Sequence, residues 1–214
     1  MSRSGAPVEK RRTRLVTSER RAQLLALGLQ VFASRSYDEV SMEELATRAG
    51  ISKGLVYHYF PTKRHFYVAA LREAARQLVA ETETDDDAPP SERLQKGLSA
   101  YLTFVERHAR AYTALMRGGV GSDKQVAAVI EQTRGAFVER LLAAPEVGAA
   151  ASPRLRLAAR GWIGFVEATA LEWIQQHESS AARSSEARAR SEAAITREDL
   201  IRMWMVVLFA ATGY

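Results

Sequence analysis

Apolar residues recur at helical spacing along most of the chain. Between Thr17 and Arg35, the positions of Leu25, Leu29 and Phe32 are four and three residues apart, as one face of an α-helix requires. No segment of useful length alternates apolar and polar residues with the period of two that a half-buried strand shows. The pattern therefore predicts an all-α protein.

Ser41 and Glu44 form a capping box at the start of the next helix. The Ser41 hydroxyl can accept a hydrogen bond from the backbone N–H of Glu44, whose carboxylate can reach back. This short helix runs through Arg48. Gly50 ends it, because glycine suits the left-handed conformation that a tight turn needs.

Ser52 begins a third helix that covers residues 53–59, and Pro61 stops it. Thr62 then caps a long helix that extends to about Thr84. The second and third short helices are joined by a tight turn, which is the pattern of a helix-turn-helix motif. We therefore divide the chain into a flexible basic arm (1–16), a three-helix helix-turn-helix domain (17–62) and a larger C-terminal domain (63–214).

The C-terminal domain also consists of helices separated by breaks, and we expect it to form a helical bundle. Helices are predicted from Ser91 to a bend near His108 and on to a glycine-rich loop at 118–121, over 123–144, from Pro153 to about Gln176, and over 197–211. Residues 178–194 are either a loop or a polar helix. Eight to ten helices are expected in all.

The third helix divides its side chains between two faces. Lys53, Tyr57 and His58 alternate with Leu55 and Val56, so one face offers hydrogen-bond donors and flat rings while the other is apolar. A helix that enters a DNA groove needs this division, because its inner face must stay packed against the domain. The pattern indicates a recognition helix.

Two further positions favour contact with phosphates. Gly54 lets the main chain come close to the DNA backbone, and Lys63 lies in the first turn of the next helix, where free N–H groups point toward an anion. Residues 1–64 carry 12 Lys and Arg against 6 Asp and Glu, whereas the rest of the chain carries 18 against 19. From charge alone, an anion-binding head and a basic tail that aids solubility are alternatives, and the motif favours the head.

Residues 41–71 strongly resemble the TetR family of bacterial transcriptional regulators. The preceding helix, with Val31-Phe32-Ala33 near its end and Tyr37 after it, is similar to that family's first helix, so the resemblance covers about residues 17–71. It implies an all-helical homodimer whose C-terminal domain binds a small effector and whose last two helices pair with those of the second subunit. It also implies that effector binding shifts the long connecting helix and releases the operator DNA.

The resemblance assigns roles to individual positions around the third helix. It implies phosphate contacts for Ser41, Tyr57 and Lys63, and base or backbone contacts at the start of the recognition helix. Tyr59 either packs the small domain together with Phe60 or also reaches DNA. The full set of expected DNA-binding residues is Ser41, Ser52, Lys53, Gly54, Leu55, Tyr57, His58, Tyr59 and Lys63.

Two N-terminal features leave alternatives open. The basic arm from Lys10 to Arg14 either follows the minor groove, as the arms of some helix-turn-helix proteins do, or is disordered. The family usually has glycine where this chain has Ser36, and a serine in a left-handed cap costs about 1 kcal/mol. The turn after the first helix is therefore expected to differ locally.

Helical bundles bind ligands between their helices, in pockets that are mostly apolar. Glu167 interrupts an apolar run, where burying a lone carboxylate is costly. It has three candidate roles: it anchors a ligand, it pairs with an internal arginine such as Arg134, or it faces the partner subunit. Candidate effector-binding residues are Tyr101, Phe104, Tyr112, Met116, Phe137, Trp162, Phe165 and Glu167, and the expected effector is a small, largely apolar molecule.

The helices at 154–176 and 197–211 are the expected dimer surface. The last helix is apolar over most of its circumference, which is more than one internal contact needs. Gly161 and Gly164 would permit close approach of two helices. Candidate interface residues are Trp162, Trp173, Ile201, Trp204, Met205 and Leu208; the alternative is that both helices are buried within one chain.

Composition argues against other classes of protein. The absence of cysteine removes disulfides and thiolate chemistry and fits a reducing cytoplasm. The four histidines lack metal-ligand spacing, and the loop at 118–121 lacks the Lys-Ser/Thr pair of a phosphate-binding loop. No apolar run approaches the roughly 18–20 residues of a membrane span.

We therefore expect a cytoplasmic, homodimeric repressor with no cofactor, metal site or membrane partner, whose partners are double-stranded operator DNA and a small effector. An effector-independent DNA-binding protein or an activator is the main alternative, and an enzyme is not expected.

Overall fold

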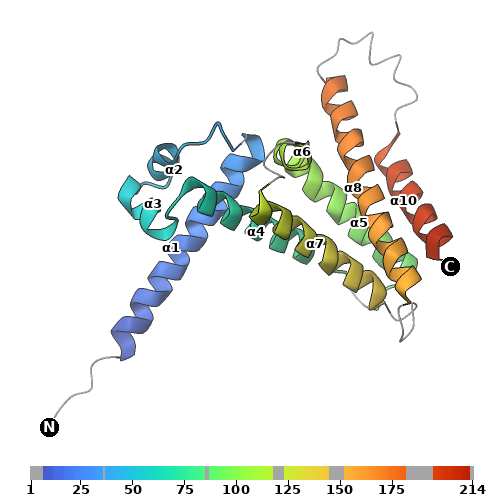
Figure 1. Ribbon diagram of the computed structural model, residues 1–214, viewed down its shortest axis with the longest axis horizontal. Coiled ribbons are helices and arrows are strands. Elements are labelled where there is room, and N and C mark those ends of the chain that lie inside the picture. The colour runs from blue at the N-terminus through green and yellow to red at the C-terminus, as the bar shows by residue number, and fades with distance from the viewer. Residues whose placement is uncertain are drawn as a thin grey trace. The chain divides into compact units, whose positions relative to one another are not determined.

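The computed structural model describes residues 7–35, 37–84, 87–117, 123–144, 152–181 and 195–212 (Figure 1). These residues form nine α-helices, and none of them lies in a β-strand. The predicted all-α class is confirmed. The chain divides into two compact units, Met1–Ala74 and Ala75–Tyr214.

The N-terminal unit contains α1 (Pro7–Ser34), α2 (Met42–Arg48), α3 (Lys53–Tyr59) and the first half of α4 (Lys63–Glu81). Apolar side chains from all four helices meet in one core, which removes them from water and stabilises helices too short to persist alone. The buried members of this core are Leu24, Leu25, Val31, Phe32, Val40, Met42, Leu45, Ala46, Val56, Phe60, Phe66 and Ala70.

Local signals fix the bounds of the two short helices. The hydroxyl of Ser41 accepts from the backbone N–H of Glu44 at 3.1 Å, and that of Ser52 accepts from Leu55 at 3.2 Å. Each is an N-cap that satisfies an N–H group lacking a helical partner. Gly50 has a φ of 65°, so the turn between α2 and α3 uses the left-handed conformation that glycine permits.

Gly28 allows α1 and α4 to approach each other closely. A Cβ atom built on Gly28 would lie 2.7 Å from Cζ and 2.8 Å from Cε1 of the Phe66 ring. Phe66 is completely buried and makes an edge contact with Phe60, with ring centroids 4.8 Å apart. The ring therefore fills the space that a side chain at position 28 would need.

Two of the expected domain bounds differ from the structure. Helix α1 begins at Pro7, so helix covers residues 7–16, where we expected a flexible arm. This stretch has no apolar period, but it is rich in Arg, Lys and Glu, which are good helix formers. The first compact unit extends to Ala74 rather than 62, because Phe66 and Ala70 of α4 belong to its core.

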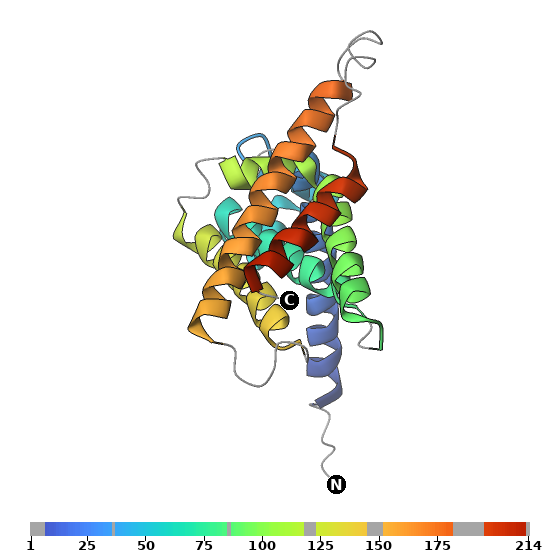
Figure 2. The ribbon, with the colours of Figure 1, turned by 90° about the vertical axis from the view of Figure 1, so that its right-hand side faces the viewer.

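The C-terminal unit contains the end of α4 together with α5 (Pro90–Arg107), α6 (Ala109–Arg117), α7 (Lys124–Leu142), α8 (Pro153–Ala181) and α10 (Arg197–Thr212). Helix α8 packs against both α7 and α10, and Figures 1 and 2 show α8 and α10 side by side. These helices form a bundle whose buried side chains include Leu98, Tyr101, Leu102, Val105, Val126, Val138, Trp162, Ile163, Val166, Trp173, Leu200 and Trp204.

The end of α4 is held by an arginine from α7. Arg140 donates hydrogen bonds of 2.9 Å to the hydroxyl of Thr82 and 2.9 Å to the carbonyl oxygen of Val79. Val79 is among the last residues of α4, where the carbonyl groups receive no hydrogen bond from an N–H group of the same helix. A guanidinium group therefore caps the C-terminal end of α4 from within the bundle.

The predicted helices agree with the observed ones in order and type. Residues 53–59 match α3 at both ends, and the expected bend near His108 separates α5 from α6. Ser36, the loop at 118–121 and most of 178–194 lie outside the described residues. Of the helices that can be assessed, none is both long and apolar enough to cross a membrane.

Candidate DNA interface and effector domain

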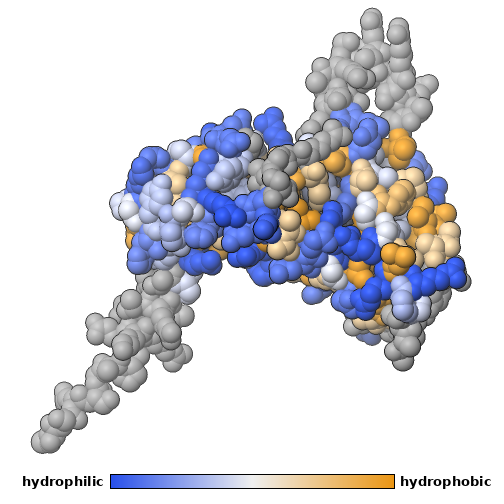
Figure 3. All heavy atoms as spheres, viewed as in Figure 1, coloured by the Kyte–Doolittle hydropathy of each residue, from blue (hydrophilic) through white to orange (hydrophobic). Residues whose placement is uncertain are grey.

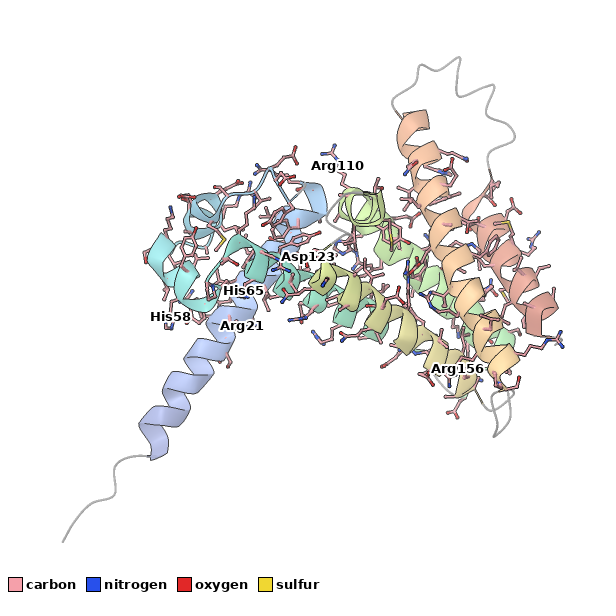
Figure 4. The ribbon with its side chains drawn as sticks, in the orientation of Figure 1. Arg21, His58, His65, Arg110, Asp123 and Arg156 are labelled. Carbon is pink, nitrogen blue, oxygen red and sulfur yellow. The ribbon has the colours of Figure 1, made fainter. Side chains whose placement is uncertain are left out.

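Helix α3 presents one packed side and one exposed side. Val56 is completely buried, whereas Leu55 and Tyr57 are 37% and 38% exposed. Lys53 and His58 are also exposed, and Figure 4 shows His58 at the outer end of α3, pointing away from the helix. The division of faces predicted from the sequence holds for Val56, whereas Leu55, expected on the packed face, is as exposed as Tyr57.

Lys53, at the start of α3, contacts two side chains. Its ammonium forms an ion pair with Glu43 of α2 and lies 5.9 Å from the centre of the Tyr57 ring. The hydrogen bond to Glu43 raises the pKa of Lys53, and the same bond lowers the pKa of Glu43. Both groups are therefore charged at neutral pH.

Lys63 lies in the first turn of α4, which follows the recognition helix in the chain. Its ammonium lies 4.4 Å from the centre of the Tyr37 ring and donates to the carbonyl oxygen of Asp38 at 3.3 Å. The Thr62 hydroxyl caps this helix by accepting from the backbone N–H of His65 at 3.1 Å. A lysine next to a capped helix start is suited to bind an anion.

Glu44 completes only half of the predicted capping box. Its backbone N–H donates to Ser41, but its carboxylate accepts from Arg35 at 2.5 and 2.6 Å and pairs with Arg48 at 2.9 Å. Contacts with two guanidinium groups outweigh the single hydrogen bond that the carboxylate would accept from the backbone N–H of the cap. Glu44 thus ties α2 to the end of α1.

Tyr59 lies closer to the core than the other expected DNA-binding residues. It is partly buried and packs against the N-terminal core, with its ring 5.4 Å from that of His58. Phe60 is buried, and the guanidinium of Arg21 lies 5.3 Å from the centre of its ring. Of the two roles considered for Tyr59, packing is observed.

Glu167 pairs with Arg134 of α7, one of its three candidate partners. The Arg134 Nε donates to the two carboxylate oxygens at 3.0 and 2.8 Å, and a terminal nitrogen lies 2.7 Å from Oε2. The Glu167 side chain is only 14% exposed and that of Arg134 24%. Arg134 therefore supplies the positive charge that the Glu167 carboxylate requires in this apolar run.

Two tyrosines lie next to this pair inside the bundle. The hydroxyls of Tyr101 and Tyr112 are 2.8 Å apart, and Tyr112 donates to the backbone carbonyl of Glu167 at 3.4 Å. Burial raises the pKa of both tyrosines, so both remain neutral hydrogen-bonding groups. The ring of Tyr101 also makes an edge contact with Phe137 at 6.4 Å.

The structure brings some of the effector candidates together and leaves others apart. Tyr101, Tyr112, Phe137 and Glu167 form one connected cluster. Phe104 is buried, and its ring centroid lies 4.5 Å from that of His108. Trp162 donates a hydrogen bond to the backbone of α10. Met116 and Phe165 are partly buried.

Most of the expected dimer-interface residues are buried inside the chain itself, which corrects the prediction for them. Trp204 has no exposed surface, and its indole donates to Thr169 at 2.7 Å. The indole of Trp162 donates to the backbone carbonyl of Trp204 at 2.7 Å. Of the six candidates, Trp162, Trp173, Ile201, Trp204 and Leu208 are buried and Met205 is partly exposed.

The exposed faces of α8 and α10 consist of residues that were not among the six candidates. Leu157 is 74% exposed and Val206 59% exposed, and a Cβ atom at Gly161 or Gly164 would meet nothing within 4 Å. Apolar surface is visible over these two helices in Figure 3. An apolar face with glycines in open space is suited to close approach by another helix.

Two family profiles match most of the chain. The profile described as "Bacterial regulatory proteins, tetR family" matches residues 24–70, and the one described as "Tetracyclin repressor-like, C-terminal domain" matches residues 90–210. The second match alone spans more than half of the chain. The chain belongs to the TetR family. It is thus a DNA-binding transcriptional regulator and not an enzyme.

Relatives of this TetR-family regulator include proteins of both regulatory signs. The transcriptional activator FasR of Mycolicibacterium smegmatis is 30% identical over 173 residues, which is 77% of each chain. The transcriptional repressor KstR of Rhodococcus jostii is 30% identical over 125 residues, 58% of each chain.

Solved structures support the same family. A tetR-family regulator from Streptomyces coelicolor is 33% identical, with a TM-score of 0.72 over 92% of this chain and 83% of the other. FadR of Bacillus subtilis, solved in complex with stearoyl-CoA, is 16% identical with a TM-score of 0.60, over 89% of this chain and 97% of FadR. The likeness to FadR is one of fold alone.

Glu43 was not among the residues expected from sequence. It stands ten positions before Lys53, on the other side of a turn, so no helical spacing rule joins the two. The exposed carboxylate of Glu43 beside Lys53 is visible only in the structure.

Proposed function

We propose that this TetR-family regulator binds operator DNA as a homodimer through α3 and releases it when a small, largely apolar effector binds the C-terminal bundle. The observation that carries the proposal is the exposed side of α3, where Lys53, Tyr57 and His58 lie opposite the buried Val56. Donors and flat rings on a short helix match the acceptor-rich major groove. Ser41, Ser52, Gly54, Leu55, Tyr59 and Lys63 complete the proposed interface.

The DNA-binding role of α3 is tested by footprinting the DNA upstream of the gene that encodes this chain. We expect protection by the wild type and its loss in Tyr57→Ala, because the variant removes an exposed ring and hydroxyl from the reading face. Leu157→Ala is the control, since it removes an exposed apolar side chain from the other compact unit. Unchanged protection by Tyr57→Ala would remove α3 from the interface.

The outward faces of α8 and α10 are proposed as the homodimer surface. The exposed Leu157 and Val206, with open space around Gly161 and Gly164, support close packing of a second copy. Val206→Glu should convert dimer to monomer in analytical ultracentrifugation, because it inserts a charge into that contact. Leu55→Glu is the matched control on α3. A stable Val206→Glu dimer would contradict the proposed surface.

The effector is proposed to occupy the bundle near the cluster of Tyr101, Tyr112, Phe137 and Glu167. Aromatic rings next to a few hydrogen-bonding groups resemble the lining of small-molecule sites. The stearoyl-CoA bound by FadR suggests long acyl thioesters as the first class to try, because their acyl chain is the apolar group that the cluster would bind, and the polar coenzyme A part serves as the control. Stearoyl-CoA should raise the melting temperature and lower DNA affinity, whereas free coenzyme A should do neither. If neither compound acts, the acyl thioester class is wrong.

Activation is the second candidate mode of regulation. The similarity to FasR, an activator, favours it. Transcription in vitro from the protected promoter separates the two modes, because a repressor lowers transcript yield and an activator raises it.

A further inference from the structure

The ion pair between Glu43 and Lys53 lies at the start of α3, on the surface proposed to face DNA. The two side chains are 60% and 53% exposed. The Lys53 ammonium pairs with the carboxylate of Glu43 on α2 and lies 5.9 Å from the centre of the Tyr57 ring on α3. The pair thus presents one donor and one acceptor next to each other.

The two carboxylates of α2 have different surroundings. Glu44 is 26% exposed and its two oxygens are taken by Arg35 and Arg48, so it serves to connect helices. Glu43 is more than twice as exposed and contacts a residue of the recognition helix instead. Its carboxylate therefore has room to accept a further hydrogen bond from a group that approaches α3.

An exposed negative charge on a DNA-binding surface lowers general affinity, because it is repelled by the phosphates. It also partly neutralises Lys53, which would otherwise attract them. Affinity for the DNA backbone therefore does not explain Glu43. A carboxylate does contribute to discrimination, since it accepts hydrogen bonds from amino groups and rejects positions that present only acceptors.

We propose that Glu43 and Lys53 together read one G·C base pair in the major groove. Lys53 donates to O6 and N7 of guanine, and Glu43 accepts from N4 of the paired cytosine. These base atoms are neighbours on the edge of a single pair, as the two side-chain groups are neighbours in the protein. The inference rests on the proposed role of α3 and adds the base that this end of the helix selects.

An A·T pair fits this arrangement less well. Adenine N6 would donate to Glu43, but the two acceptors of this pair, N7 of adenine and O4 of thymine, lie on opposite sides of N6, so the Lys53 ammonium can reach only one of them. Guanine offers the ammonium two acceptors. Glu43 and Lys53 together therefore favour a G·C pair over an A·T pair.

The test is a selection from a library of double-stranded DNA with a random core, carried out at one salt concentration with full-length proteins. Wild type, Glu43→Gln and Lys53→Met are compared. Glu92→Gln is the matched control, because Glu92 forms an ion pair of 2.8 Å with Lys96 whose side chains are 51% and 58% exposed, in the other compact unit. Circular dichroism checks that each variant is folded.

We expect the wild type to select a motif in which one G·C pair per half-site loses its preference in both variants. A good base contact discriminates by about 1–3 kcal/mol, so the preference at that pair should fall about tenfold while the other positions are retained. Glu43→Gln should also bind unrelated DNA more tightly than the wild type, and Glu92→Gln should match the wild type throughout.

Three results would overturn the inference. They are an unchanged motif in both variants, loss of preference at different positions in the two variants, and loss at an A·T pair. If the wild type selects no motif, or if Tyr57→Ala selects the same motif as the wild type, the proposed role of α3 itself fails. The two failures are therefore distinguishable.

Discussion

Replacing Gly28 with alanine should destabilise the N-terminal unit, although alanine is normally the better helix former. The added Cβ would lie 2.7 Å from Cζ of Phe66 and 3.4 Å from Cβ of Ala70, whereas carbon atoms in contact are separated by roughly 3.5–4.0 Å. Phe66 has no exposed surface, and its ring contacts those of Phe60 and Phe32, at centroid distances of 4.8 and 6.0 Å. The ring is therefore enclosed by other aromatic side chains.

The net effect is the difference between two terms. Alanine is favoured over glycine inside a helix by about 1 kcal/mol. Forcing an extra group into a packed core costs about 1–3 kcal/mol. A gap nearly 1 Å too short against a fully buried ring places Gly28→Ala at the upper end of that range, so we expect a loss of about 1–2 kcal/mol in the free energy of unfolding.

Gly135→Ala is the control, because Gly135 lies inside α7 and a Cβ there would meet nothing within 4 Å. It should gain up to about 1 kcal/mol. Urea denaturation followed by far-UV circular dichroism measures both variants. All three tryptophans lie between 162 and 204, so their fluorescence reports the C-terminal unit separately.

A second background isolates the contact itself. In Phe66→Leu, the shorter side chain leaves room at position 28, so adding Gly28→Ala should cost less than it does in the wild type. If Gly28→Ala stabilises the protein as Gly135→Ala does, or costs the same in both backgrounds, the close approach of α1 and α4 is wrong.

Three further outcomes follow from the contacts described above. Lys63→Ala should weaken binding to all DNA sequences and lower the slope of log affinity against log salt by about one unit, whereas Lys124→Ala should leave the slope unchanged. Glu167→Ala should lower the free energy of unfolding by about 2 kcal/mol, because it leaves the part-buried Arg134 without its counter-charge. Urea denaturation should detect no such loss in Glu139→Ala, because Glu139 is exposed. Burial raises the pKa of Tyr112, so the unfolded chain loses the hydroxyl proton near pH ~10 while the folded protein keeps it. The free energy of unfolding should therefore fall as the pH rises beyond that point, and it should fall less in Tyr112→Phe. Equal pH dependence of the two proteins in urea denaturation would contradict this.

Local chemistry explains which helices were predictable. The bounds of α3 follow from Ser52 before it and Pro61 after it, and both signals act within a few residues. The start of α1 was missed because apolar periodicity reports a packed face, whereas residues 7–16 form helix without such a pattern. Periodicity detects amphipathic helices and overlooks those that depend on intrinsic propensity.

The sequence predicted a side-chain partner only where a charged group in an apolar segment needs an opposite charge nearby. Glu167 stood in an apolar run, so a buried cation was among its expected partners, and Arg134 provides it. The burial of Trp204 could not be predicted, because a helix that is apolar all round fits the interior of one chain as well as a contact between two. Packing against α8 decides that question, and it depends on contacts between distant segments.

The arginine at the end of α4 has a mechanical consequence. Helix α4 contains neither glycine nor proline across its 19 residues, so it has no built-in hinge at which to bend. Its first half belongs to the core beneath the recognition helix, and Arg140 of α7 grips its last turn. A displacement of α7 would therefore act directly on the last turn of α4, through the hydrogen bonds that Arg140 donates there.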